Sequence, residues 1–143
     1  RINGSLGEPG WVPIHYVTSA YPRSVLAGLY RLASVGLVTP MRDGMNLVAK
    51  EYVAAQDPTD PGVLILSKFA GAAQQLSAAL IVNPNDKLEV AEAIRDALHM
   101  SQRERVTRWQ TMMGPLRKHD VSWWAATFLK ELAQPGHTPA IGT

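Results

Sequence analysis

Short apolar runs that alternate with longer stretches of helical spacing are the feature that most constrains the fold of this chain. Residues 35–38, 63–66 and 80–82 are apolar almost throughout, which is typical of strands buried on both faces of a sheet. Apolar residues in the stretches between them recur three and four positions apart, as one face of a helix requires. Alternating strands and helices form right-handed βαβ units. The sequence therefore predicts an α/β fold with a parallel sheet.

A fourth strand is expected in residues 11–17. Several of these residues are apolar or β-branched, and we expect a strand here despite Pro13. Residues 1–10 contain three glycines and a proline and are expected to form a loop. Four strands are fewer than a full doubly wound domain usually has, which suggests a truncated half of one. Spacing and start signals predict helices in residues 19–33, 46–56, 72–76, 86–100, 101–114 and 119–132.

Local signals also predict how some helices begin and which residues they bury. Asp86 is expected to cap the helix after it, and Ser101 with Glu104 is expected to form a capping box. Four residues of the helix in 46–56 are expected to face inward: Leu47, Val48, Tyr52 and Val53. Three tryptophans are expected to pack the C-terminal helices together: Trp109, Trp123 and Trp124.

The composition favours one globular domain and excludes several kinds of site. The 143 residues include 46% hydrophobic and 18% charged ones, with Lys+Arg 14 nearly balanced by Asp+Glu 12. Glu104 interrupts the basic residues near the C-terminus, which favours a solvated helix face over a nucleic-acid site. The absence of cysteine excludes disulfides and thiolate chemistry, and the four histidines lack metal-ligand spacing.

The sequence also bears on location. No apolar run approaches the roughly 20 residues that a membrane span needs, so no membrane partner is expected. The chain begins at Arg1 without a methionine or a signal-peptide pattern, so we expect a cytoplasmic protein and a fragment of a longer one.

The most informative local stretch is residues 42–52, between the strand in 35–38 and the next helix. Asp43, Gly44 and Asn46 lie where open α/β sheets bind ligands, at the carboxyl end of a strand. The helix behind them directs unpaired N–H groups toward the same space. A second acid, Glu51, follows two turns into the helix, and we expect it to share one crevice with Asp43. This arrangement suits a sugar held by hydrogen bonds and a phosphate held by backbone.

Each of these residues also has a simpler interpretation. Asp43 is a good helix N-cap, a role worth ~1 kcal/mol. Glu51 is either a solvated helical residue or a ligand for ribose hydroxyls, and Lys50 is more typical of a surface lysine than of a phosphate ligand. Tyr21 is either a structural staple before a helix or a stacking partner for a nucleobase. A third strand-end loop contains Lys68, Phe69 and Gly71 and could border the same cleft.

Five segments of the chain resemble the trehalose-6-phosphate synthase family, glycosyltransferase family 20. The segments are residues 2–4, 11–13, 36–52, 64–71 and 79–84, and the similarity extends to about Leu132. The most specific part is the run Asp-Gly-Met-Asn-Leu-Val-Ala-Lys-Glu at positions 43–51.

The resemblance implies a fold and a reaction. That family has two Rossmann-like domains facing across a cleft, the GT-B arrangement. It transfers glucose from UDP-glucose or GDP-glucose to glucose 6-phosphate with retention, giving trehalose 6-phosphate, with no cofactor and no essential metal. Residues 1–133 would be the C-terminal part of the donor domain, a partial Rossmann-like sheet with C-terminal helices. Residues 134–143 are rich in Pro and Gly, and this composition predicts a disordered tail.

The resemblance also implies roles for the residues around the sugar. Asp43 would bind the hydroxyls of the glucose and position the sugar. It is the one residue to which the resemblance gives a catalytic role. The backbone of Gly44, Met45 and Asn46 would lie beside it. Glu51 would hold the ribose hydroxyls.

The remaining implied contacts concern the diphosphate and the base. Leu47 and Val48 would donate backbone N–H groups to the diphosphate, and Ala49 and Lys50 belong to the same binding run. Tyr21 would lie by the uracil, where relatives often carry phenylalanine.

The same resemblance implies partners that this chain lacks. The acceptor-binding domain and the basic residues that neutralise the donor phosphates would lie before Arg1, so the isolated chain is expected to lack turnover. A homo-oligomer is left open. Two alternatives remain at this point: a non-catalytic nucleotide-binding or regulatory synthase-like module, and a nucleic-acid-binding module.

Overall fold

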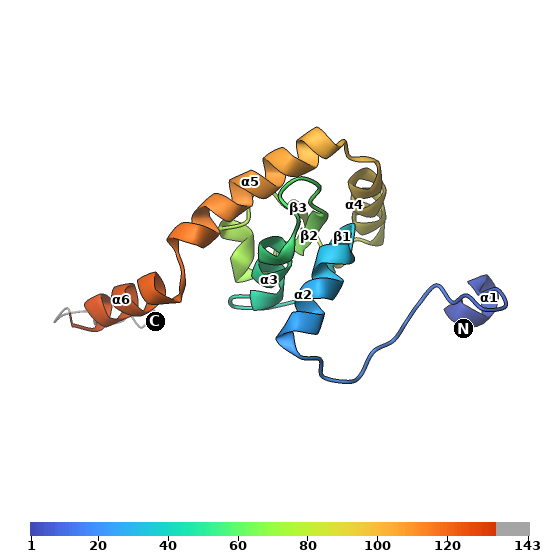
Figure 1. The fold of residues 1–143 in the computed structure, drawn as a ribbon, viewed down its shortest axis with the longest axis horizontal. Helices are drawn as coiled ribbons and strands as arrows, with labels where there is room; N and C mark the ends of the chain where they lie inside the picture. Colours follow the sequence, from blue (N-terminus) through green and yellow to red (C-terminus); the bar gives the residue numbers. More distant parts are fainter. Residues whose placement is uncertain (134–143) are drawn as a thin grey trace, which may run out of the picture.

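A three-stranded parallel sheet forms the centre of the molecule in the computed structural model, which describes residues 1–133 (Figure 1). Strands β1 (Val35–Val38), β2 (Val63–Ser67) and β3 (Leu80–Val82) lie in the order β1-β2-β3. Both pairs of neighbouring strands are parallel. The predicted α/β fold with a parallel sheet is confirmed.

Helices cover both faces of this sheet. The helices of the described residues are α1 (Ile2–Leu6), α2 (Arg23–Leu32), α3 (Leu47–Ala55), the 3-10 helix η1 (Gly71–Gln74), α4 (Lys87–His99), α5 (Gln102–Lys118) and α6 (Val121–Leu132), and α1 and α6 lie away from the sheet (Figure 1). Helices α3 and α5 contribute to the core on one face, and α4 packs on the other. Within the described part of the chain, no helix has the length and apolar character of a membrane span.

Alternate residues of β2 build the two cores. Leu64 and Leu66 pack with residues of α3 and α5, whereas Val63 and Ile65 pack with residues of α4. All five residues of β2 are buried, which confirms the predicted two-sided burial for this strand. The prediction is wrong for the other two strands, because Leu37 of β1 and Ile81 of β3 are partly exposed at the edges of the three-stranded sheet.

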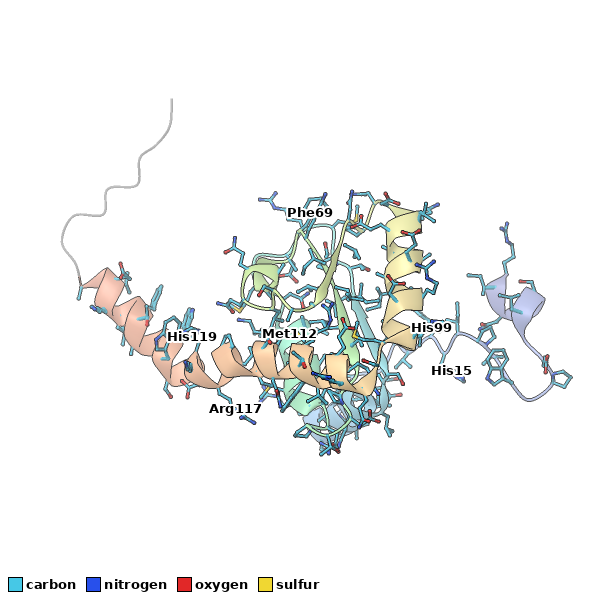
Figure 2. The ribbon with its side chains drawn as sticks, turned by 90° about the horizontal axis from the view of Figure 1, so that it is seen from above. His15, Phe69, His99, Met112, Arg117 and His119 are labelled. Carbon is cyan, nitrogen blue, oxygen red and sulfur yellow. The ribbon has the colours of Figure 1, made fainter. Side chains whose placement is uncertain are left out.

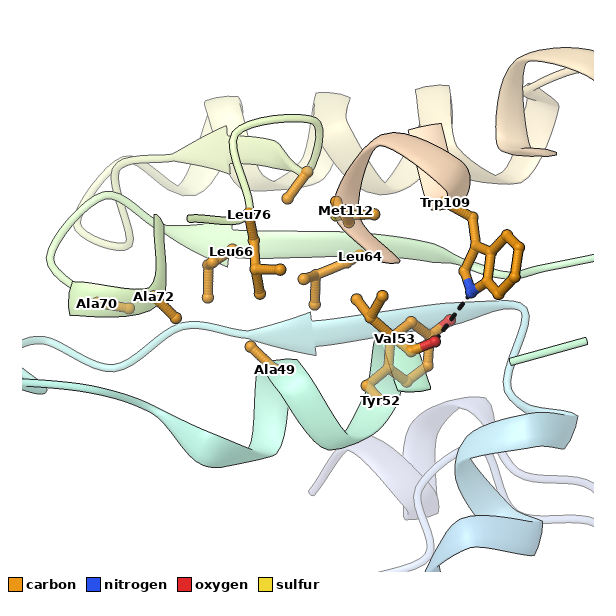
Figure 3. Packing of buried hydrophobic residues seen from close by; sticks show 11 residues of the cluster. Ala49, Tyr52, Val53, Leu64, Leu66, Ala70, Ala72, Leu76, Trp109 and Met112 are labelled. Atoms are coloured by element: carbon orange, nitrogen blue, oxygen red, sulfur yellow. Dashed lines mark hydrogen bonds between the residues drawn. The ribbon is translucent and has the colours of Figure 1, made fainter. Parts of the chain in front are cut away.

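Trp109 joins α5 to α3 at the edge of the larger core (Figure 3). Its indole Nε1–H donates a hydrogen bond of 2.9 Å to the backbone carbonyl of Val53, and the side chain is buried. Trp109 is thus a packing residue as predicted, but it packs α5 against α3 rather than joining the C-terminal helices to one another. The prediction is wrong for Trp123 and Trp124, which are 44% and 51% exposed on α6. Helix α6 continues away from the body beyond His119 (Figure 2), so those tryptophans have no core to enter.

Tyr52 fixes α3 against β1. Its hydroxyl donates a hydrogen bond of 2.9 Å to the carbonyl of Ala33, and burial raises the pKa of the phenol to about 12. The ring lies flat against Gly36 of β1, where an added Cβ would come within 2.8 Å of ring carbons. Glycine at this position therefore permits the close approach of helix and strand. The sequence did not predict this role for Gly36.

The N-terminal segment differs most from the expectation. Residues 2–6 form α1 rather than a loop, and residues 11–17 form no strand of the sheet. Asn3 accounts for part of this difference, because its side-chain amide bonds both the N–H and the carbonyl of Ile14, at 2.9 and 2.7 Å. Glu8 and Trp11 pair across a tight turn in which Gly10 has a φ of +84°. These local bonds replace the predicted fourth strand, and the segment lies apart from the sheet (Figure 1).

Several helix boundaries also differ. Helix α2 begins at Arg23 with Pro22 as its N-cap, later than predicted, and the helix expected in 72–76 is the 3-10 helix η1. Helix α5 continues through Pro115 to Lys118, although proline lacks the N–H that a helix interior uses. Asp86 and Ser101 cap α4 and α5 as predicted, but the Glu104 side chain pairs with Arg108 instead of completing the predicted capping box. The predicted disordered tail, 134–143, lies outside the described residues.

Replacing Trp109 by phenylalanine should destabilise the chain by about 1–3 kcal/mol, because the carbonyl of Val53 loses its indole donor and keeps only the 3.4 Å bond from the N–H of Gln56. Urea unfolding measures the change. The matched control is Trp123→Phe on α6, which should stay within about 0.5 kcal/mol because that indole is exposed and its Nε1 donates no hydrogen bond within residues 1–133. Equal losses in the two variants would contradict the role assigned to the Trp109 hydrogen bond.

Candidate functional site

The turn between β1 and α3 is organised around the Asp43 carboxylate. Its Oδ1 accepts a hydrogen bond from the N–H of Met45 at 3.0 Å, and its Oδ2 accepts one from the side-chain amide of Asn46 at 2.9 Å. The Met45 bond, followed by the Asn46 bond, lowers the pKa of Asp43 from its usual value. The carboxylate is therefore ionised at neutral pH, and its position is set by two donors.

Asn46, rather than Asp43, is the N-cap of α3. Its side-chain Oδ1 accepts a hydrogen bond of 2.9 Å from the N–H of Ala49. Its backbone has φ 70° and ψ 87°, a left-handed conformation that asparagine adopts more readily than most residues. The predicted N-cap role of Asp43 is wrong, because the helix begins three residues later and Asp43 instead holds the amide of the cap. The signal available in the sequence was the asparagine directly before the helical run.

The loop after β2 holds this turn from behind. Asp43 and Ala70 form a parallel bridge, in which the N–H of Gly71 donates to the carbonyl of Asp43 at 2.8 Å. The N–H of Ala72 donates to the carbonyl of Met45 at 2.7 Å. The sequence predicted Gly71 at the border of the site but not Ala72, whose contribution is a backbone group and leaves no side-chain signal.

The opposite side of the turn is open. An added Cβ at Gly44 would meet no atom within 4 Å. Leu47 and Val48 are 58% and 45% exposed, so the prediction that they face inward is wrong. Within residues 1–133 the N–H groups of both residues lack a hydrogen-bond acceptor, as is usual in the first turn of a helix.

The phase of α3 explains this exposure. Each residue advances about 100° around a helix, so Leu47, Val48 and Glu51 lie on one face. The opposite face consists of the buried residues Ala49, Tyr52 and Val53. Ala49 is completely buried, and Lys50 is half-buried between the two faces.

Glu51 lines a hollow of about 420 Å³ between α2 and α3. The other lining residues are Arg23, Leu26, Ala27, Tyr30, Ala54 and Ala55. The α2 residues among them recur at the spacing i, i+3, i+4 and i+7, the one signal by which the sequence could have revealed this face. Asp43 does not line the hollow. The predicted site is therefore in two parts, and the described residues alone do not form the expected crevice shared by Asp43 and Glu51.

Tyr21 and the histidines remain to be placed. Tyr21 is partly exposed directly before Pro22 and α2, and it lies outside the lining of the hollow. No group of three or more His, Asp or Glu among the described residues is arranged to hold a metal ion. His15, His99 and His119 lie on separate parts of the chain (Figure 2). That the site needs neither metal nor cofactor stays a prediction.

Comparison with solved structures matches this geometry to known proteins. An E. coli structure described as trehalose-6-phosphate bound with UDP-2-fluoro glucose has a TM-score of 0.89 at 53% identity, covering 92% of this chain and 29% of that one. An alpha,alpha-trehalose-phosphate synthase (UDP-forming) from Burkholderia xenovorans, in complex with glucose-6-phosphate, has a TM-score of 0.89 at 57% identity, covering 92% and 29%. These matches confirm the predicted Rossmann-like part of a GT-B fold.

Sequence comparison agrees with the structural one. The Trehalose-6-phosphate synthase of Sinorhizobium fredii (strain NBRC 101917 / NGR234) is 60% identical over 132 residues, which are 92% of this chain and 28% of that protein. The chain therefore spans less than a third of the length of this curated relative. The family model for Glycosyltransferase family 20 matches residues 1–134. Together, the turn, the sheet behind it and this match over nearly the whole chain show that the protein belongs to glycosyltransferase family 20.

Proposed function

We propose that this chain forms the donor-binding side of a retaining glucosyltransferase. The whole protein would transfer glucose from UDP-glucose to glucose 6-phosphate and give trehalose 6-phosphate. The support is the family match, together with similar structures described as UDP-forming, as bound with UDP-2-fluoro glucose and as in complex with glucose-6-phosphate. The glucose 6-phosphate site would lie in a domain outside this chain.

The proposal rests on the structure of the turn. One side of the turn is held by hydrogen bonds, and the other side is open. Each carboxylate oxygen of Asp43 accepts one hydrogen bond within the turn and can accept a second from a sugar hydroxyl. The backbone at Gly44 is free of protein atoms on its open side. A hexose against this surface would contact a fixed anion and a fixed peptide.

The start of α3 supplies the diphosphate side of the proposed site. The N–H groups of Leu47 and Val48 have no acceptor within the described residues, and helix N-termini favour negative charge. Fixed donors at this point stabilise the charge that develops on the leaving diphosphate. Glu51, one turn further along the same face, would bind the ribose hydroxyls, and Tyr21 would lie by the uracil.

These residues orient and stabilise rather than attack. Asp43 is held by two donors and would position the hexose, which lowers the entropy cost of reaching the reactive geometry. The leaving phosphate would assist attack on the front face, which retains the stereochemistry. UDP-glucose is a substrate in this scheme, and no cofactor or metal is part of it. Cytoplasmic residence and a homo-oligomeric state stay predictions.

Turnover tests the proposal directly. The whole protein should form trehalose 6-phosphate and UDP when given UDP-glucose and glucose 6-phosphate, whereas the 143-residue chain alone should show no turnover. Product formation with GDP-glucose only would correct the donor. Nucleotide-sugar binding without turnover in the whole protein would favour a non-catalytic synthase-like module instead.

Replacing Glu51 by alanine in the whole protein should weaken UDP-glucose binding by about 1–3 kcal/mol, the scale of a lost charged hydrogen bond. Calorimetric titration measures this change. The matched control is Glu92→Ala, an exposed glutamate in the middle of α4, which should leave donor affinity unchanged. Unchanged affinity in the Glu51 variant would contradict the ribose assignment.

Two substitutions at Asn46 separate its backbone conformation from its side-chain bonds. Alanine loses the cap and is strained at φ 70°, so kcat/KM should fall by about tenfold or more, equivalent to about 1.4 kcal/mol. Glycine adopts this φ at no steric cost, so Asn46→Gly should lose only a few fold. Steady-state kinetics on the whole protein measures both. If the two variants were equally impaired, the conformation of the turn would not be what Asn46 provides.

A further inference from the structure

Gly71 lies directly behind the peptide that the proposed hexose site uses. Its N–H donates to the carbonyl of Asp43 at 2.8 Å. An added Cβ at Gly71 would lie 2.8 Å from the carbonyl carbon of Gly44 and nearer still to its oxygen, and 3.3 Å from the backbone nitrogen of Met45. Real Cβ atoms essentially never come within 3.0 Å of such an atom. The turn and the loop after β2 are thus in contact, backbone to backbone.

The requirement for glycine at this position is spatial. Gly71 does not have the positive φ that would demand glycine for conformational reasons. The atoms in the way belong to the main chain of the Gly44–Met45 peptide, and main chain cannot rotate aside as a flexible side chain does. A side chain at position 71 would therefore push this peptide toward its open side.

The two sides of the Gly44–Met45 peptide differ sharply. Its rear side touches Gly71, whereas an added Cβ on Gly44 would meet no protein atom within 4 Å. The bonds from Gly71 to Asp43 and from Ala72 to Met45 attach the turn to the chain leaving β2, whose residues are all buried. The contacts of Gly71 and Ala72 with the turn therefore determine where its open surface lies.

We propose that Gly71 is a positioning residue for the donor site: it sets the location of the Gly44–Met45 peptide against which the hexose binds. Gly71 itself touches no substrate. The proposal rests on the function proposed above. Misplacing groups in a site by about 1 Å can cost ~100-fold in rate, and the Gly71 contact leaves the peptide no room to the rear.

The test is Gly71→Ala in the whole protein, with kcat, KM and the affinities for UDP-glucose and for UDP measured side by side. We expect kcat/KM for UDP-glucose to fall by about 10- to 100-fold. The affinity for UDP, which lacks the hexose, should stay within about threefold of the wild type. Gly71→Ser, with one more atom, should be impaired more than Gly71→Ala.

The matched control is Gly114→Ala in α5, where an added Cβ would meet nothing within 4 Å and kinetics should be unchanged. The inference is overturned if Gly71→Ala behaves like this control, or if its affinities for UDP and UDP-glucose fall in parallel. Failure of Gly71→Ala to fold while Gly114→Ala folds would also overturn it, by assigning Gly71 to the fold alone. Failure of the proposed function is distinguishable, because the wild type would then bind no UDP-glucose.

Discussion

The two-sided burial of β2 is the constraint on which the rest of this structure depends. Its residues divide between a core with α3 and α5 and a core with α4. A shift by one residue would exchange the side chains of the two faces, so the packing fixes the register of the strand. The chain that leaves its carboxyl end then bonds to the Asp43 turn through Gly71 and Ala72. Core packing is in this way transmitted to the site by backbone hydrogen bonds.

Helix α3 connects the core to the proposed donor side in a similar manner. Its rear face buries Ala49, Tyr52 and Val53, while its front face carries Leu47, Val48 and Glu51. The helical repeat sets which residues share a face, and the packing of Ala49, Tyr52 and Val53 in the core leaves the other face outward. Exposed apolar residues on such a helix would be unfavourable in an isolated protein, and they are consistent with a surface that a ligand or a further domain covers.

Predictions that depended on neighbouring residues were the most successful. Asp86 and Ser101 cap their helices as expected, because a cap is satisfied by N–H groups two or three residues away. Predictions that depended on distant partners were less so. Trp109 and Trp123 are the same residue type on adjacent helices, yet only Trp109 has a core beside it. Residues 11–17 have strand-like composition, but Asn3 bonds them locally instead.

The sequence by itself determined the α/β class, the parallel sheet and the turn that carries the site, because apolar runs and the residues from Asp43 to Glu51 are local patterns. The tertiary structure alone decided which face of α3 is open and that Gly71 supports the turn. These features arise from contacts between segments far apart in the chain. Such contacts depend on helix phase and on space between backbones, and neither is a property of residue types.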